Sequence, residues 1–517
     1  MKKNLLIFAV ATLLGIASVF GQSGTDGHIS WNISDNTLTI SGSAGPVIDY
    51  FYYTGTGSTA PWCKYNFTTA VIEGITSIGN NFFRGCKNLT TVTIGSSVMT
   101  IRADAFRDCS SLTTINFNAT SCTSVSSNCW LNCTSIKTLN IGDNVQVIPG
   151  NAFRNCSGIT SVTIPNLVKT IGSEAFYGWN DVTSVTIGSG LTSISNLPLS
   201  GNKLTQIIVS EQNQNFSSID GVLFNKDKTA ILRFPEGKSG TTYNIPNAVT
   251  TIGSSTFANC RNLTSITIPN LVTTIKDGAF SCSGITSIII PNLVTTIGYE
   301  AFGKCINLES ITIPNSVITI ENDAFLICES LTSVIIPNSV KTIGKGAFQS
   351  CFGLTSVIIG NSVTAIGMMA FRDCSRLTSI KSYAVTPPTT DNSQTYANTF
   401  YNVSKSISVS VFCESEDDYK RAAGWEDFTN YCNCLSATGF NKVTEANINI
   451  YPNPASNKLY IEGEGYEQVN IYDMLGKEVL SAGKEKEIDI SRLVNGVYNI
   501  SLISKGKTVV TKKLIKE

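Results

Sequence analysis

Cysteine is the residue type in this sequence that is best suited to chemistry, because ten of its sixteen cysteines recur at one position of a repeated motif. Nine stand three residues after an aromatic position, and Cys282 stands two residues after Phe280. Such a column of thiols could hold metal ions or exchange electrons, or it could consist of small buried apolar residues. Trp179 replaces cysteine in one copy, which a metal column would not tolerate, so we favour apolar packing. The ten residues are Cys86, Cys109, Cys133, Cys156, Cys260, Cys282, Cys305, Cys328, Cys351 and Cys374.

The other six cysteines do not follow this spacing. Neighbouring thiols of the column would be about 5 Å apart, but parallel stacking orients them poorly for bonding. Disulfides near the ends of the repeated region are expected among the six instead, in an oxidising compartment, with the pairing left open. A metal site at Cys432-x-Cys434 is disfavoured because no histidine lies near it. The six are Cys63, Cys122, Cys129, Cys413, Cys432 and Cys434.

Acid–base chemistry has few candidates. His28 is the one histidine of the chain, and nothing near it indicates the nucleophile and orienting group of a triad. Carboxylate pairs such as Asp104/Asp108 and Glu321/Asp323 could cleave a glycosidic bond if they were correctly spaced, but they occupy variable turn positions that are typical of solvated surface. No glycine-rich phosphate loop and no G-x-S-x-G motif is present. We therefore predict no enzyme activity and no catalytic, metal-binding or cofactor-binding residue.

The segments that carry these residues repeat. Phenylalanine recurs at intervals of mostly 23 residues, and Trp130 and Leu199 take its place in two degenerate copies, which gives twelve copies. A fixed period between 20 and 50 residues is the mark of a solenoid. The phenylalanines are Phe83, Phe106, Phe153, Phe176, Phe257, Phe280, Phe302, Phe325, Phe348 and Phe371.

One unit reads L-T-S-I-T-I-P-N-x-V-T-T-I-G-x-x-A-F-x-x-C-x-x. From Leu263 to Ile268, apolar and hydroxyl side chains alternate, which is typical of a strand with one buried face. Pro269 ends this strand because it has no N–H to donate, and a second short extended piece follows from Val272 to Ile275. The A-F-x-x-C segment is expected to turn the chain as one helical or 3₁₀ turn. Stacked units can bury the apolar residues that one unit cannot, so the sequence predicts a repeat solenoid that is β-rich with short helical turns.

One copy is interrupted between Val209 and Asn244. Two apolar runs in this insertion flank the polar stretch Lys226–Asp227–Lys228, a pattern typical of a β-hairpin. The segment 209–244 is therefore predicted to be an inserted hairpin that projects from the solenoid.

The unit resembles the BspA-like leucine-rich repeat of bacterial surface proteins over residues 70–382, and the insertion is similar to one that recurs in that family. The stretch GHISWNISDNTLTISG, with Pro61–Trp62, resembles the family's N-terminal cap and places a β cap at 22–69. The stretch VFCESEDDYKRAAGWEDF resembles its closing cap, expected at 383–434. The resemblance implies a leucine-rich repeat array of about twelve 23-residue units and adhesion to host matrix proteins, other cells or surface components.

The composition changes after about residue 435, where the period ends and charged residues become denser. Alternating runs such as KLYIEG and QVNIYDMLGKEVL predict a small all-β sandwich over 448–517, after a linker at 435–447. The segments INIYPNPASNKLYIE, VNIYDMLGKEVL and L-x-x-G-x-Y resemble a type A sorting domain of the type IX secretion system. This resemblance implies interaction with that secretion machinery, transport across the outer membrane, removal of the domain within the linker, and attachment to the surface. The sorting-motif residues are Tyr451, Pro452, Asn453, Pro454, Leu493, Gly496 and Tyr498.

Residues 1–21 have the pattern of a signal peptide. A basic start precedes an apolar run from Leu5 to Val19, and cleavage is expected before Gln22. No later stretch reaches the length of a membrane span, so no transmembrane span is expected in the mature protein. Basic and acidic residues number 37 each, and only 14% of residues are charged, which gives no electrostatic reason to bind nucleic acid. We expect export across both membranes to the cell surface or the extracellular space.

The outward side of the long strands is the candidate ligand-contact face. It is uncharged, rich in hydroxyl groups, and partly apolar in the later copies. It could dock an extended glycan or a protein surface, or its Ser and Thr residues could merely suit exposed strand positions. The ten candidate residues are Ser265, Thr267, Ser287, Ile289, Ser310, Thr312, Ser333, Ile335, Ser356 and Ile358.

These features favour a secreted or surface-attached protein, without catalytic activity, that mediates binding or adhesion to host proteins, cells or glycans. The expected partner is a protein or glycan ligand at the cell surface. A passive structural coat or antigen is the alternative. An exported hydrolase is a further alternative, but no catalytic domain is visible outside the repeats.

Overall fold

The computed structural model divides the chain into two units, Met1–Cys434 and Leu435–Glu517. It describes residues 22–53, 57–194, 203–391, 398–431, 435, 449–451, 455–462, 466–472, 478–494, 496–504 and 507–516. The predicted signal peptide, and the predicted linker apart from residue 435, lie outside the described residues. Among the helices of the described part, none has both the length and the apolar character that a membrane crossing requires.

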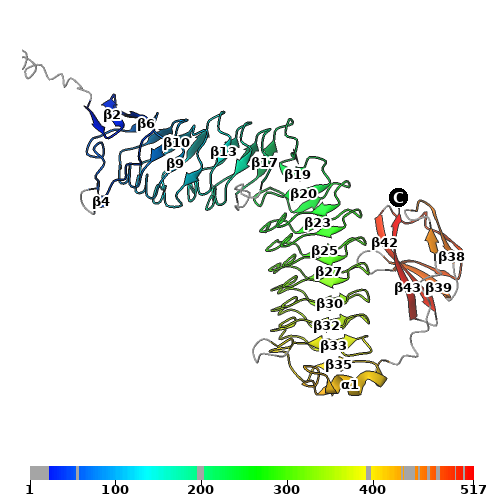
Figure 1. Ribbon diagram of the computed structural model, residues 1–517. Helices are drawn as coiled ribbons and strands as arrows, with labels where there is room; N and C mark the ends of the chain where they lie inside the picture. The colour runs from blue at the N-terminus through cyan, green and yellow to red at the C-terminus, as the bar shows by residue number, and fades with distance from the viewer. Residues whose placement is uncertain are drawn as a thin grey trace, which may run out of the picture. The chain divides into compact units, whose positions relative to one another are not determined.

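The first unit is a solenoid of about 15 turns with a spacing of about 23 residues, which confirms the predicted fold class (Figure 1). Each turn contributes a long strand, a short strand and a corner. Equivalent strands of neighbouring turns pair in parallel and in register, as Ser333 with Ser356 and Ile335 with Ile358 show. The turns outnumber the twelve copies counted from the sequence because the cap segments add strands to the same rows.

The long strands form a row that extends through the first unit, and most of them pair with the equivalent strand of the next turn. They are β6 (Thr69–Ile72), β8 (Thr91–Ile94), β10 (Thr114–Phe117), β12 (Thr138–Ile141), β14 (Ser161–Ile164), β16 (Ser184–Ile187), β17 (Gln206–Val209), β21 (Thr242–Asn244), β23 (Ser265–Thr267), β25 (Ser287–Ile289), β27 (Ser310–Thr312), β29 (Ser333–Ile336), β31 (Ser356–Ile359), β33 (Ser379–Ser382), β35 (Ser408–Ser410) and β36 (Asn430–Tyr431).

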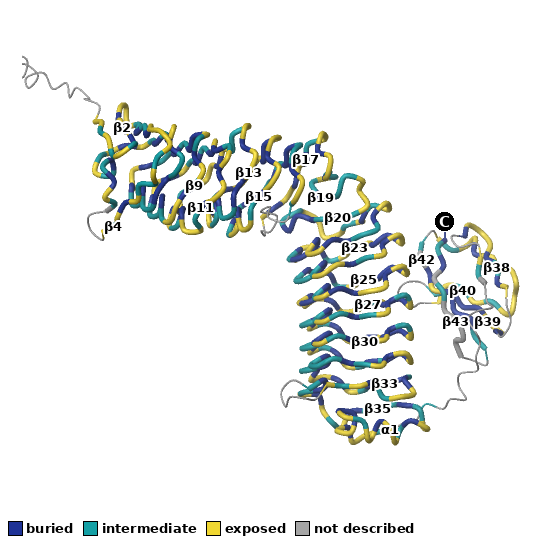
Figure 2. The backbone as a smooth tube through the Cα atoms, viewed as in Figure 1, coloured by how far each residue is buried: buried dark blue, intermediate teal, exposed yellow. Residues whose placement is uncertain are grey.

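The short strands form a second row. They are β7 (Ser77–Ile78), β9 (Thr100–Ile101), β11 (Ser124–Val125), β13 (Val147–Ile148), β15 (Thr170–Ile171), β22 (Thr251–Ile252), β24 (Thr274–Ile275), β26 (Thr296–Ile297), β28 (Thr319–Ile320), β30 (Thr342–Ile343), β32 (Ala365–Ile366) and β34 (Thr389–Thr390). In both rows buried residues alternate with more exposed ones, as the burial colours of Figure 2 show along the turns.

The corner of each turn is not the helical or 3₁₀ turn expected from the sequence. The second residue before the phenylalanine and the second after it have positive φ, as Asp323 (55°) and Ile327 (57°) have around Phe325. Left-handed residues interrupt a right-handed helix, and the backbone bonds to the next turn instead. Phe325 donates its N–H to the carbonyl of Ala347, and Ile327 donates to the carbonyl of Gln349, both at 2.8 Å. The corners therefore form a third ladder of hydrogen bonds between turns, and none of the described corners between 69 and 391 contains a helix.

Ile327 is the residue least suited to its corner position, and Ile327→Asn is expected to stabilise the solenoid by about 1 kcal/mol. The left-handed conformation costs an L-residue about 1–2 kcal/mol, and a β-branched side chain suits it least. Asn155 and Asn259 occupy equivalent corners at φ of 64° and 60°. The urea midpoint of the exported protein measures the gain, and Ile327→Val, which stays β-branched, is the matched control. Equal midpoints for the two variants would show that this corner stores no strain.

A stack of aromatic rings forms the centre of the core. Consecutive ring centroids from Phe257 to Phe371 lie 5.0–5.4 Å apart, and their planes differ by no more than 8°. Phe400 of the closing cap continues the stack 5.7 Å beyond Phe371. The sequence analysis missed Phe400 because its interval from Phe371 is 29 residues.

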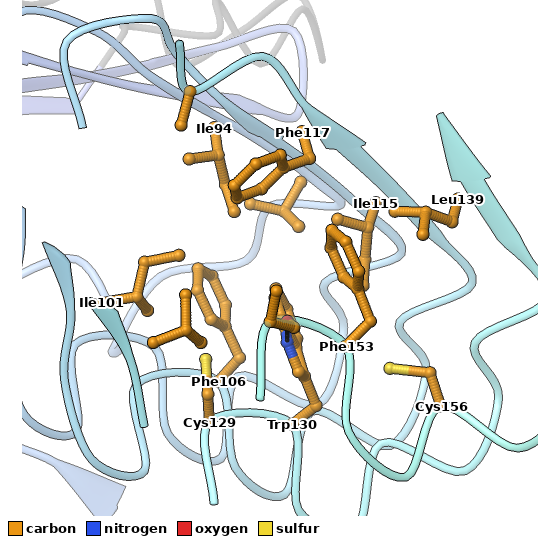
Figure 3. Packing of buried hydrophobic residues seen from close by; sticks show 14 of the residues in the cluster. Ile94, Ile101, Phe106, Ile115, Phe117, Cys129, Trp130, Leu139, Phe153 and Cys156 are labelled. Carbon is orange, nitrogen blue, oxygen red and sulfur yellow. Dashed lines mark hydrogen bonds between the residues drawn. The ribbon is translucent and has the colours of Figure 1, made fainter. Parts of the chain in front are cut away.

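The N-terminal half of the core also contains stacked rings, but less regularly, since the rings of Phe153 and Phe176 lie 5.9 Å apart with planes that differ by 28°. Phe106 stacks on Trp130 with ring centroids 4.6 Å apart, and Figure 3 shows the two rings side by side with Cys129 next to them. The indole N–H of Trp130 donates to the carbonyl of Ala152 at 2.7 Å, so the larger ring satisfies its polar atom within the next corner. Leu199, predicted to replace phenylalanine in another copy, lies outside the described residues.

The insertion is built into the solenoid and does not project from it as predicted. Its strands are antiparallel, and the last one then pairs in parallel with β22, so it takes a place in the short row. Leu223 belongs to the core cluster that precedes the insertion, whereas Val222 and Phe224 belong to the cluster that follows it, and all three are fully buried. The apolar runs therefore join two cores, which a free hairpin would not require. The strands are β18 (Phe216–Ile219), β19 (Val222–Asn225) and β20 (Ala230–Arg233).

The N-terminal cap is a small antiparallel sheet that pairs in parallel with β6 through its last strand. Trp62, which is fully buried, covers the first turn, with its ring centroid 4.6 Å from that of Phe82. The cap strands are β1 (Gln22–Asp26), β2 (Ile29–Ser34) and β3 (Thr37–Gly42), and β4 (Tyr52–Tyr53) and β5 (Gly57–Ser58) form a separate two-stranded sheet.

The closing cap carries the described helices of the chain, η1 (Cys413–Ser415) and α1 (Glu416–Arg421). Trp425 is fully buried, with its ring 5.1 Å from that of Phe400. Its indole N–H donates to the carbonyl of Pro388 at 2.9 Å. The cap therefore ends the aromatic stack with a ring whose polar atom is satisfied.

The second unit consists of two antiparallel sheets over one core, as expected for a small sandwich. Leu459 and Ile488 from one sheet pack in the same cluster as Ile471, Ile500 and Leu502 from the other. The first sheet contains β37 (Asn449–Tyr451), β38 (Lys458–Glu462) and β41 (Glu487–Asp489), and the second contains β40 (Glu478–Gly483), β39 (Gln468–Tyr472), β42 (Gly496–Ser504) and β43 (Lys507–Lys516).

Candidate binding face

The ten candidate contact residues lie on one face of the long-strand row, which we call the strand face. Ile289 stands opposite Thr312 in the pairing of β25 with β27, and Ile335 stands opposite Ile358 in the pairing of β29 with β31. In-register pairing places equivalent residues in columns. The serine column is Ser265, Ser287, Ser310, Ser333 and Ser356, and the second column is Thr267, Ile289, Thr312, Ile335 and Ile358.

The second column exposes large apolar side chains. Ile335 is 61% exposed and Ile289 is 45% exposed, while Ile358 is half-buried. Ile335 and Ile358 lie directly beside each other, so they form a small apolar patch between the hydroxyl-bearing residues. Exposed apolar patches on strands that are otherwise polar often mark contact sites.

A neighbouring column of hydroxyl groups is used by the scaffold itself. The threonine of each L-T-S sequence donates through Oγ1 to the backbone carbonyl of the preceding turn, as Thr355 does to Thr332 at 2.9 Å and Thr378 does to Thr355 at 3.0 Å. The five serine hydroxyls of the strand face, with those of Thr267 and Thr312, have no hydrogen-bond partner among the residues that the structure describes. These hydroxyls can donate to and accept from a bound molecule or water.

The strand face carries no charge until its C-terminal edge. Lys381 stands opposite Ile358 in the pairing of β31 with β33, and its ammonium group lies 4.9 Å from the centroid of the Tyr383 ring. Recognition at the face would therefore depend on shape, apolar contact and neutral hydrogen bonds rather than on long-range attraction.

Most of the recurrent cysteines act as buried hydrogen-bond donors. The Sγ atom of Cys328 lies 3.2 Å from the carbonyl oxygen of Phe302, in the preceding turn. Cys351 makes the same contact with Phe325, again at 3.2 Å. Trp179, which replaces cysteine in its copy, donates its indole N–H to the carbonyl of the preceding phenylalanine at 2.8 Å. A residue at this position therefore has to supply a buried hydrogen-bond donor, which explains why tryptophan can replace cysteine there.

Burial keeps these thiols protonated. It raises the pKa of Cys305 and of Cys351 to about 12, from an ordinary value of about 9. A protonated thiol can donate to a carbonyl but is a poor metal ligand and nucleophile. Within the described residues, no group of three His, Cys, Asp or Glu side chains is placed to hold a metal ion.

The first carboxylate pair considered for glycoside cleavage, Asp104/Asp108, is engaged in ion pairs with arginines. Asp104 accepts hydrogen bonds from Arg84 at 3.1 Å and from Arg107 at 3.3 Å, and Asp108 accepts one from Arg84 at 3.4 Å. These arginines neutralise both carboxylates and link neighbouring corners. The pKa of Asp323 is raised, first by burial and then by the charge of a nearby glutamate in the preceding turn.

His28 packs in the N-terminal cap. A β-carbon added at Gly45 would come within 2.5 Å of the His28 ring, so the ring lies directly against this glycine. The glycine is required by this close approach, and the histidine has the surroundings of a packed side chain.

Comparison with protein families agrees with this architecture. A model described as the BspA type leucine-rich repeat region matches residues 61–166, 146–239, 233–351 and 295–420. The chain belongs to the BspA-type leucine-rich repeat family. A second model, described as a secretion system C-terminal sorting domain, matches residues 449–517. This BspA-type protein is therefore exported by the type IX secretion system to the cell surface or the extracellular space.

Solved structures similar to this BspA-type chain include leucine-rich repeat proteins of bacteria. A leucine-rich repeat protein from Eubacterium ventriosum is 28% identical, with a TM-score of 0.50, over 74% of this chain and 95% of that one. A leucine-rich cell surface protein from Faecalibacterium prausnitzii is 24% identical, with a TM-score of 0.38, over 74% and 98%. The pneumococcal vaccine antigen PcpA is 20% identical, with a TM-score of 0.42, over 80% and 98%. No curated protein matches the chain.

The sorting-motif residues of this BspA-type chain differ in their surroundings. Tyr498 is buried and donates its hydroxyl to the carbonyl of Val494 at 2.8 Å, and Leu493 packs against the same core. Gly496 begins β42, whereas Tyr451 ends β37 and is 46% exposed. Pro452, Asn453 and Pro454 lie outside the described residues. Of the four described motif residues, Leu493 and Tyr498 therefore pack in the core, Gly496 begins a strand and Tyr451 is exposed.

Proposed function

We propose that this chain is a surface protein without catalytic activity that binds a protein or glycan ligand through the strand face. The observation that carries the proposal is the contrast between two neighbouring hydroxyl columns. The threonine column is satisfied by backbone carbonyls, as at Thr355 and Thr378. The serine column and the exposed side chains of Ile289 and Ile335 have no such partner in the described structure.

The construction of the face favours binding. Its side chains stand on paired strands whose register is fixed, and Ser, Thr and Ile have few rotamers to lose when a ligand docks. Because the contact residues are preorganised, little binding free energy is lost in ordering the surface. The repeated spacing of the turns, about 4.8 Å between strands, suits an extended ligand that offers equivalent groups at regular intervals.

Location supports the same function. The sorting domain and the family both belong to exported surface proteins. At the surface, the accessible partners are host proteins, other cells and glycans. A neutral face rich in hydroxyl groups can contact either a carbohydrate or an exposed polypeptide, and the proposal therefore names both classes.

A binding screen tests this function. The mature exported protein would be applied over a concentration series to immobilised matrix proteins, mucin and bacterial glycans. Saturable binding to one class supports the proposal. Uniformly absent binding would favour a passive coat or antigen, and release of sugars from the glycans would indicate a hydrolase.

Substitution of both neighbouring isoleucines, Ile335→Asp with Ile358→Asp, is expected to weaken this binding by about tenfold or more. Two carboxylates would need to lose water on docking, which costs more than the apolar contacts that they replace. Ile318→Asp is the matched control, because Ile318 is 44% exposed and lies beside β28 in the short row. Dissociation constants are measured by surface plasmon resonance, with urea midpoints as a check on folding. An unchanged constant in a folded double variant would remove the strand face from consideration.

A further inference from the structure

The top of the thiol column differs from most of the column. Cys109, Cys305 and Cys374 each place Sγ 3.0–3.2 Å from the carbonyl oxygen of a phenylalanine in the preceding turn. Cys86 belongs to the first phenylalanine turn, and the segment before it carries Trp62 in the N-terminal cap. The Sγ atom of Cys86 instead lies 2.9 Å from the Sγ atom of Cys63.

This separation is shorter than ordinary packing of two sulfur atoms, and a disulfide bond is about 2.05 Å long. Adjacent turns of a parallel β array are about 4.8 Å apart, inside the range of Cα separations that disulfides span. Cys63 is held in place by its N–H, which donates to Ala60 at 3.1 Å, and by the buried ring of Trp62, whose indole N–H donates to Phe82 at 3.1 Å. The two sulfur atoms are therefore preorganised to bond.

The two thiols differ in solvent accessibility, and oxidation requires that at least one of them can be reached by an oxidant. Cys63 is half-buried, so an oxidant can reach it, whereas Cys86 is only 8% exposed. Contact with Cys63 and burial raise the pKa of the Cys86 thiol well above its ordinary range. Cys63 is thus the residue that reacts first, and Cys86 is the residue that completes the bond.

We propose that Cys63 and Cys86 form a disulfide bond in the exported protein, which fastens the N-terminal cap to the first phenylalanine turn. The oxidant is a disulfide of a thiol oxidoreductase or a small-molecule disulfide in the export compartment, where such bonds persist. Cys63 Sγ loses its proton and attacks one sulfur of the oxidant, whose other sulfur leaves as a thiolate. Cys86 Sγ then loses its proton and attacks Cys63 Sγ, and the second sulfur of the oxidant leaves. The protein loses two hydrogen atoms, which reduce the oxidant to a dithiol in the oxidoreductase or to two thiols in the small-molecule case.

The disulfide bond would stabilise the terminal turn, which is the least stable part of a solenoid. A terminal turn has a neighbour on one side only, so it opens before the central turns do. Without the bond, the cap is attached by non-covalent contacts alone, which include Trp62 against Phe82, the pairing of β3 with β6 and the ion pair of Asp49 with Arg102. A covalent link between cap and first turn prevents the cap from separating while the remaining turns stay folded.

Peptide mapping tests the proposal on the full exported protein. The protein is recovered from cells with free thiols blocked by an alkylating agent, denatured with more agent present, and digested with trypsin without a reductant. Trypsin leaves Cys63 in the peptide that ends at Lys64 and Cys86 in the tripeptide 85–87. We expect the two peptides to be recovered as one linked species that separates on reduction.

Cys374 is the matched control, because it lies in the short peptide 373–376 and its thiol contacts a carbonyl. It is expected to be alkylated without reduction. Recovery of Cys86 as an alkylated tripeptide, or linked to a cysteine other than Cys63, overturns the proposal.

Thermal unfolding gives a second measurement. A reductant is expected to lower the first unfolding midpoint of the exported protein by about 5 °C. Cys63→Ser, at a half-buried position, is expected to show the lower midpoint with or without reductant. Equal midpoints for the oxidised native protein and Cys63→Ser would contradict a fastening role, and an effect of reductant on Cys63→Ser would place the responsible bond elsewhere.

Discussion

Replacement of Phe302 by alanine is expected to lower the free energy of unfolding by about 3–5 kcal/mol. The ring is fully buried and stacks between Phe280 and Phe325, at centroid distances of 5.1 and 5.3 Å. Its removal leaves a cavity that neighbouring turns cannot fill without moving the hydrogen-bonded corners. Because each turn of a solenoid is stabilised mainly by its neighbours, the loss should weaken the flanking turns as well.

Urea denaturation of the exported protein measures this effect, and amide hydrogen exchange locates it. The N–H of Phe302 donates to Ala324, and that of Phe280 donates to Ala301, so both amides should exchange faster in the variant. Phe352→Ala is the matched control, because Phe352 is 44% exposed, and a change within about 0.5 kcal/mol is expected. Equal losses for the two variants would show that the aromatic stack does not stabilise the array.

Truncation before residue 435 is expected to abolish surface display, with surface protein falling at least tenfold, to background. The removed residues include 449–517, which match the sorting-domain family. The solenoid retains its own core and caps, since the first unit is compact by itself. Truncated protein should therefore accumulate inside the cell in a folded form, as measured by surface labelling and fractionation.

The double variant Ile335→Asp with Ile358→Asp serves as the control for display, because its sorting domain is unchanged and it should reach the surface in normal amounts. Normal display of the truncated chain would contradict the assignment of the sorting domain. We further predict that the surface protein ends within 435–447, a range in which the structure describes residue 435 alone. Intact-mass analysis that finds surface protein still carrying Glu517 would show that the domain is not removed.

The sequence was sufficient to predict the solenoid because its signal is repeated many times. The strand from Leu263 to Ile268 alternates in the same way in most copies, and proline or glycine follows it, so each copy reinforces the assignment. The outward positions could also be identified. Side chains alternate along a strand, so residues next to the buried isoleucines must face the surface. The predicted columns of the strand face follow from this alternation.

Features that depend on contacts between turns could not be predicted. The corner around Phe325 consists of residues that are compatible with a helical turn, but inter-turn bonds hold Asp323 and Ile327 at positive φ. The insertion has the pattern of a hairpin, but only the two core clusters show that β19 is buried between them. The stacking of Phe400 was hidden by its irregular spacing.

The same limit applies to the candidate site. Thr355 and Ser356 are adjacent hydroxyl residues, and the sequence does not show which of the two hydroxyl groups is bonded within the solenoid. The structure does, because Thr355 donates to a carbonyl of the preceding turn and Ser356 faces outward without a partner in the described residues. The contact between Cys63 and Cys86 could not be predicted either, because one cysteine belongs to the repeat and the other does not.

The most direct test of the central claim, that this exported solenoid binds through its strand face, is an adhesion measurement on cells. Cells that display the native protein and cells that display the Ile335→Asp, Ile358→Asp variant, matched for surface amount by antibody labelling, are applied to matrix proteins, mucin and glycans. We predict saturable adhesion of the native cells to one class of coating and a loss of about tenfold or more for the variant cells. Equal adhesion of the two strains, or no adhesion to any coating, would contradict the account.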